Sequence, residues 1–159
     1  MNWFNLQDLE NRLSENSVSD QEGFYYLLAN LILFGLGSYG ASDTYHHGGF
    51  IFAEIVIMLT IIIVGLNLTF KANQNGDGHN YFKRFLALYF VIGIRLLVFV
   101  LLLAIPAGIL GFFIFGEEIS NTFLQDLLFL GLYAGIGIIY YYFLVRSFKK
   151  VAQSNPQAE

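Results

Sequence analysis

Four long blocks of apolar residues constrain the fold of this chain more than any other feature. They run from Phe24 to Ala41, Phe50 to Phe70, Phe82 to Phe115 and Phe123 to Val145. A helix on the surface of a soluble domain shows polar residues every third or fourth position on its wet face. These blocks show almost none, as is typical of helices surrounded by hydrocarbon. Composition agrees, since 13% of the residues are charged against about 25% in a soluble domain.

The block lengths predict an all-α, polytopic membrane protein with four transmembrane helices, over about 24–41, 50–70, 82–105 and 123–145. A bilayer core about 30 Å thick needs about 20 helical residues. The third block is too long for one span, and Pro106 stands where that span should end, because proline removes a backbone donor. We expect Ala107 to Phe115 to form either a kinked continuation or a helix in the interface.

The distribution of lysine and arginine predicts the orientation. The link between the second and third spans and the segment after the fourth carry the basic residues, namely Lys71, Lys83, Arg84, Arg146, Lys149 and Lys150. The other two links have no lysine or arginine. The positive-inside rule then places both termini in the cytoplasm, with 149–159 as a cytoplasmic tail. A short chain without a signal-peptide pattern suits the bacterial inner membrane.

Residues 1–18 are predicted to form a short amphipathic helix on the cytoplasmic side, because Leu6, Leu9 and Leu13 recur at helical spacing. Three arrangements are open: the helix lies on the membrane anchored by Trp3 and Phe4, it packs on another subunit or a protein partner, or the segment is disordered. The transmembrane domain, 19–148, then follows. Capping-box patterns at Ser19 to Glu22 and Thr122 to Gln125 mark two helix starts, and Gly76 to Gly78 marks a turn.

Two ionisable residues lie within the predicted spans, Glu54 in the second and Arg95 in the third. Charges in a bilayer are costly, so each is a functional candidate. The two spans are joined by a short link and are expected to be neighbours. Glu54 and Arg95 could therefore form a buried ion pair that pins two helices together. Alternatively, they line a water-filled path and select ions by charge.

The outer link contains Asp43, His46 and His47. Adjacent histidines point in different directions, and no HExxH spacing is present, so no metal site is predicted. An exposed loop is the favoured interpretation, with pH sensing by His46 and His47 as the alternative. Thiolate sites are excluded by the lack of cysteine. No catalytic or cofactor motif is found, so neither enzymatic activity nor a cofactor is expected. The net charge of −4 argues against nucleic-acid binding.

Small residues at four-residue spacing indicate close helix packing within or between subunits. The pairs are Gly37 with Ala41, Ala107 with Gly111, and Gly131 with Gly135. Near the inner end of the fourth span, the run Tyr140 to Tyr142 is typical of an interfacial aromatic belt.

The sequence favours a homo-oligomeric ion channel or pore-forming membrane protein in contact with membrane lipid. The chain has almost no soluble part, so its activity should take place in the bilayer. A subunit of this size cannot easily enclose a path alone, which is why several copies are expected. The alternative is an accessory or scaffold subunit of a larger membrane complex, with no transport activity of its own.

Overall fold

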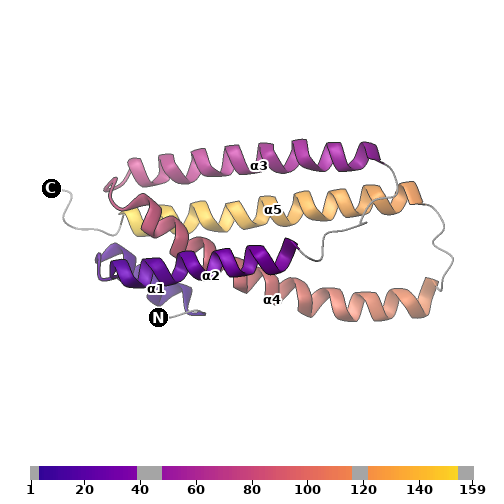
Figure 1. Ribbon diagram of the computed structural model, residues 1–159, viewed down its shortest axis with the longest axis horizontal. Coiled ribbons are helices and arrows are strands. Elements are labelled where there is room, and N and C mark those ends of the chain that lie inside the picture. Colours follow the sequence, from indigo (N-terminus) through magenta and orange to yellow (C-terminus); the bar gives the residue numbers. More distant parts are fainter. Residues whose placement is uncertain (1–3, 39–47, 116–121, 154–159) are drawn as a thin grey trace.

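The computed structural model describes residues 4–38, 48–115 and 122–153, and these fold into five α-helices. In chain order the helices are α1 (Leu6–Ser14), α2 (Asp20–Ser38), α3 (Gly48–Gln74), α4 (Tyr81–Phe115) and α5 (Thr122–Gln153). In Figure 1 the long helices α2 to α5 extend along the same direction, and the short α1 lies beside them at one end. The predicted all-α class is confirmed.

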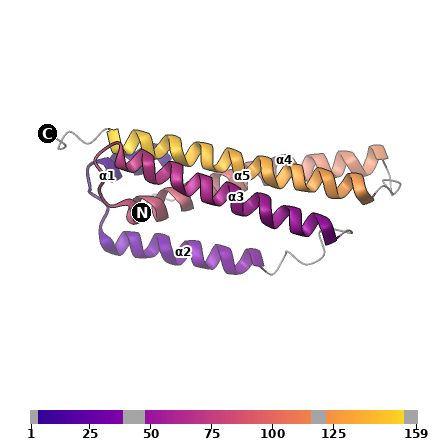
Figure 2. The same cartoon turned by 90° about the horizontal axis from the view of Figure 1, so that it is seen from above.

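The long helices pack as two pairs that are joined by α4 and α5. Helix α3 packs along α5, α2 packs on α4, and α4 in turn contacts α5. Helix α5 therefore lies between α3 and α4 (Figure 1). Seen from above, α2 stands apart from α3 and α5 (Figure 2). The second and third spans were expected to be neighbours, and they do meet beside the turn that joins them, where Thr69 Oγ1 and the Tyr81 hydroxyl are 3.0 Å apart. Along the bundle, however, α5 lies between α3 and α4.

Three of the described helices, not four, are long and apolar enough to cross a membrane. The candidate spans are Gly48–Gln74, Tyr81–Pro106 and Phe123–Gln153. Helix α2 begins with the polar residues Asp20, Gln21 and Glu22 and carries Asn30 further along. The apolar part that remains is too short for a core about 30 Å thick. The prediction of four spans is therefore corrected to three.

Helix α4 continues through Pro106 and ends only at Phe115. Of the two expectations for Ala107 to Phe115, the structure has the helical continuation rather than a separate interfacial helix. At about 1.5 Å per residue, its 35 residues extend well beyond the thickness of a bilayer core. The part of α4 that qualifies as a span still stops at Pro106, where the sequence placed its end.

The buried core lies at one end of the bundle, which we call the polar end. It comprises α1, the turn between α3 and α4, and the last turns of α5. Buried side chains from all five helices meet near it, among them Leu9, Tyr26, Ala72, Leu88, Val91, Leu144 and Phe148. Towards the opposite end, α4 exposes a continuous apolar surface from Leu101 to Ile105. The helices are therefore held together at the polar end and present apolar surface elsewhere.

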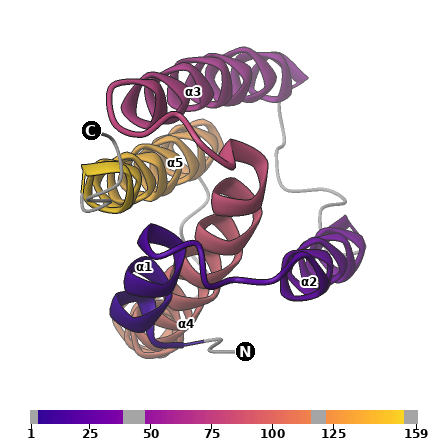
Figure 3. The same cartoon turned by 90° about the vertical axis from the view of Figure 1, so that its left-hand side faces the viewer.

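Helix α1 is anchored by the leucines that the sequence predicted to share one face. Leu9 and Leu13 are buried, and α1 packs on both α4 and α5 (Figure 3). Its apolar face is thus covered by the same chain, an arrangement that was not among the three expected. A protein partner at the N-terminal helix stays a prediction, and it would have to meet the outer surface of α1.

The predicted start of α2 and the predicted turn after α3 are both confirmed. The backbone N–H of Glu22 donates to Ser19 Oγ, and the Ser19 N–H donates to the Glu22 carboxylate, which completes the capping box. In the turn, Gly78 has φ of +69°, a conformation that favours glycine. At Gly76 a Cβ would lie 2.5 Å from the backbone oxygen of Ala152, so only glycine allows the turn to pack on α5.

Candidate functional site

A buried arginine organises the polar end. Arg84, in the first turn of α4, is 1% exposed, and the side chain of its partner Asp77 is 2% exposed. Both terminal nitrogens of Arg84 donate to the Asp77 carboxylate, with Nη2 and Oδ2 2.5 Å apart. Arg84 Nη1 also donates to Asn73 Oδ1 at 2.9 Å. This bidentate pair ties the start of α4 to the α3–α4 turn and to the end of α3.

A second polar contact fastens α1 to α5. Glu10 is buried, and its two carboxylate oxygens accept from Ser147 Oγ and Lys150 Nζ, each at 2.6 Å. Since α1 and α5 lie at opposite ends of the sequence, this contact links the two terminal regions of the chain. Both carboxylate oxygens of Glu10 already accept hydrogen bonds, so we interpret this contact as structural.

Ion pairs also fix the entry into α2. Arg12 donates to Glu22 at 2.6 Å, and Lys83 Nζ lies 2.5 Å from Asp20 Oδ1. The hydrogen bond from Arg12 holds the pKa of Glu22 below its ordinary value of 4.5, and that from Lys83 holds the pKa of Asp20 below 3.8. The Arg12 pKa is raised in turn by its bond to Glu22.

The Arg12–Glu22 pair predicts how the protein responds to acid. A carboxylate whose pKa is lower in the folded state stabilises the fold above its unfolded pKa, and this contribution is lost as the pH falls through the folded pKa. In an NMR titration, the Glu22 carboxyl should therefore have its midpoint below 4.5, and Arg12→Ala should move that midpoint upward. A wild-type midpoint at or above 4.5 would contradict the pairing.

Arg95 is the one predicted intramembrane cation, and we treat it as the candidate functional site. It lies fourteen residues beyond Tyr81, which is about 21 Å along α4. Its side chain is exposed, and Nε donates to the backbone oxygen of Phe4 at 2.9 Å. It borders a pocket of about 320 Å³, otherwise lined by apolar side chains, namely Leu6, Ile92, Leu96, Phe99, Ile139 and Phe143.

The pairing of Arg95 with Glu54 is not formed among the described residues. Glu54 is half-buried on α3, and α5 lies between α3 and the helix that carries Arg95. Arg95 instead uses one of its five N–H donors on Phe4. The alternative, in which Glu54 and Arg95 line a water-filled path, stays a prediction.

Searches against family models, curated proteins and solved structures each found no match.

The predicted small-residue pairs fall into two groups. Cβ atoms added at Gly131 and Gly135 would meet nothing within 4 Å, whereas one at the nearby Gly137 would contact Ile61 on α3. The described part of the chain thus leaves the Gly131–Gly135 face of α5 open. The other site residues predicted from the sequence cannot be compared in this way. Ala41, His46 and His47 lie outside the described residues, and only the backbone is described at Gly37, Ala107 and Gly111.

Sequence reasoning missed the Asn73–Asp77–Arg84 cluster. It counted Arg84 as a loop cation and Asp77 as a turn residue. A signal was present, since Arg84 stands two residues after Phe82 and an apolar block follows it directly. An arginine at that position must either reach the interface or find a carboxylate nearby, and Asp77 is the acidic residue nearest to it in the sequence.

Proposed function

We propose that this chain is a subunit of a homo-oligomeric channel in a bacterial inner membrane, with Arg95 attracting anions to the conduction path. The observation that carries the proposal is an exposed arginine about 21 Å along a candidate span, with a single hydrogen bond among the described residues. A charged side chain within a membrane span is costly in hydrocarbon. Water, an anion or another subunit would satisfy the remaining N–H donors.

The surfaces of the described helices support assembly. The Gly131–Gly135 face of α5 is open to close approach by another helix. Helix α4 exposes apolar side chains on several sides of its second half, including Leu102 and Ile105. Because the helices of one subunit are joined at the polar end, helices of other copies can pack between them towards the opposite end. The polar end, with its basic residues, would face the cytoplasm.

The alternative is an accessory subunit in which Arg95 pairs with a carboxylate of a different membrane protein. The same exposed cation and open glycine face would serve that role. The two functions differ in oligomeric state, because a channel forms a symmetric assembly of this chain alone. Purification in nanodiscs followed by native mass spectrometry distinguishes them: copies of one mass support the channel, and one copy that retains another protein supports the accessory role.

Anion flux into liposomes tests the role of Arg95. In a water-filled path, one charge contributes about 1 kcal/mol at close range, which is about fivefold in local anion concentration. Arg95→Gln should therefore lower chloride flux about fivefold, while Arg95→Lys, which keeps the charge, should retain most of it. Both variants lose one exposed hydrogen bond, so their melting temperatures should stay near that of the wild type. Equal flux in all three folded proteins would contradict the proposal.

A further inference from the structure

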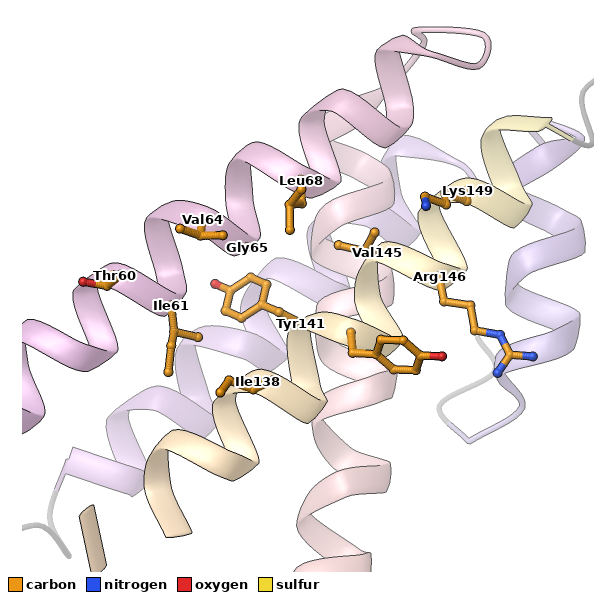
Figure 4. Close-up of a pocket in the computed structure, with 11 residues that line it drawn as sticks. Thr60, Ile61, Val64, Gly65, Leu68, Ile138, Tyr141, Val145, Arg146 and Lys149 are labelled. Carbon is orange, nitrogen blue, oxygen red and sulfur yellow. The ribbon is translucent and has the colours of Figure 1, made fainter. Parts of the chain in front are cut away.

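A groove of about 660 Å³ runs between α3 and α5 (Figure 4). Its walls are mainly apolar, with Val64 and Leu68 from α3 and Ile138 and Val145 from α5. Figure 4 shows Tyr141 directed from α5 towards Gly65 on α3. A Cβ at Gly65 would lie 2.1 Å from the Tyr141 ring, so the glycine is what allows the ring to lie against the α3 backbone.

Two cations border the groove at the polar end. Arg146 and Lys149 are among its lining residues, and both are exposed. In Figure 4 Lys149 lies at that end of the groove, and Arg146 extends from α5 away from α3. Neither has a carboxylate partner in the described part of the chain.

Four further cations of the polar end make a contrast, whereas Lys71 is exposed on α3 and does not line the groove. Arg12, Lys83, Arg84 and Lys150 each pair with an acidic residue. Positive charge is therefore neutralised where the helices pack together and is left uncompensated at the mouth of the groove. An anionic group placed there would meet Lys149 directly, and Arg146 would have to turn towards it, without breaking an existing ion pair among the described residues.

The length of the groove matches one leaflet of a bilayer. Ile138 and Lys149 mark its two ends on α5, and their separation of eleven positions corresponds to about 16 Å. Half of a hydrocarbon core about 30 Å thick is about 15 Å. The cations also follow the run Tyr140 to Tyr142, where an interfacial aromatic belt is expected. The groove thus lies at acyl-chain depth and its charged end at headgroup depth.

We propose that this groove binds one anionic phospholipid, with an acyl chain along α3 and α5 and the headgroup phosphate near Lys149 and Arg146. Basic pockets between transmembrane helices bind anionic headgroups by this combination of apolar length and terminal charge. The apolar walls favour a lipid over a free phosphate ion, and the two free cations favour a negatively charged lipid over a zwitterionic one. The site is separate from Arg95 and does not depend on channel activity.

Native mass spectrometry of the full-length protein, released from micelles doped with phosphatidylglycerol or phosphatidylcholine, tests this site. The wild type should retain one phosphatidylglycerol in preference to phosphatidylcholine. Each cation is worth about fivefold in affinity, so Arg146→Ala or Lys149→Ala should weaken retention about fivefold and the double variant about twenty-fivefold. Lys71→Ala is the matched control, because Lys71 is also exposed near the polar end but does not line the groove.

A second variant tests the apolar part of the groove while both cations are kept. Val64 is 51% exposed, so Val64→Trp should fold and fill the groove while both cations remain, and it should also lower lipid retention at least fivefold. The proposal is overturned if the double cation variant retains phosphatidylglycerol as tightly as the wild type. It is also overturned if inorganic phosphate competes fully with the lipid. A change in subunit number with Val64→Trp, without a change in lipid retention, would show that a second copy occupies the groove.

Discussion

Replacing Arg84 with alanine is expected to destabilise the protein by about 3–5 kcal/mol, because it leaves the Asp77 carboxylate buried without its partner. The two side chains are almost fully buried, at 1% and 2% exposure, and Arg84 also donates to Asn73. Loss of the Arg84–Asp77 pair should release the α3–α4 turn from the first turn of α4. Thermal unfolding in detergent, followed by circular dichroism, measures the effect.

Matched variants show whether the pair itself is responsible. Arg84→Lys should recover only part of the stability, since an ammonium group cannot make the bidentate contact. Adding Asp77→Ala to Arg84→Ala should restore stability relative to the single variant, because no charge is then left unpaired. Lys71→Ala, at an exposed position on α3, should change the melting temperature little. If Arg84→Ala is as mild as Lys71→Ala, the buried cluster does not hold the polar end together.

Replacing Leu9 with alanine is the second change with a large expected effect. Leu9 is 0% exposed, and truncating a buried leucine costs about 2–5 kcal/mol. Because Leu9 belongs to the buried core and α1 packs on α4 and α5, we expect α1 to detach before the long helices unfold. Hydrogen–deuterium exchange should then show faster exchange for α1, with little change along α3.

Phe4→Ala is the control for this prediction, because Phe4 precedes α1 and is 65% exposed. It should leave the exchange of α1 nearly unchanged, since it removes little packed surface. Unaltered exchange of α1 in Leu9→Ala would mean that its leucine face does not pack on the bundle. The helix would then lie on lipid or on a partner, as the sequence alone had suggested.

Local patterns in the sequence predicted local structure well. The capping box at Ser19 and Glu22 forms as expected, and Gly78 provides the turn that the glycines indicated. The apolar blocks located α3, α4 and α5, because hydrophobicity over some twenty residues dominates any other preference. These features depend on residues that are close in the sequence, which is why one sequence was sufficient.

Features that depend on packing between distant segments were not predictable. Nothing in the pattern of Glu54 and Arg95 reveals that α5 lies between the helices that carry them. Likewise, Glu10 meets Ser147 and Lys150 across almost the whole length of the chain. The number of spans was overestimated because the first block, although slightly short, was counted as a span. Helix α2 begins with a polar turn and carries Asn30, whose amide donates to the Leu86 backbone oxygen.

We infer that the α3–α4 turn and the end of α5 lie together at the polar end, on one side of a membrane, with the start of α3 on the other side. The chain has no cysteine, so single cysteines can be introduced at the exposed positions Asn75 and Gln153, and at Gly49 near the opposite end. Labelling of sealed vesicles with a membrane-impermeant maleimide should modify Asn75→Cys and Gln153→Cys from one side and Gly49→Cys from the other, because one candidate span separates Gly49 from Asn75 and two separate Asn75 from Gln153. Modification of Asn75→Cys and Gln153→Cys from opposite sides would contradict the structure described here.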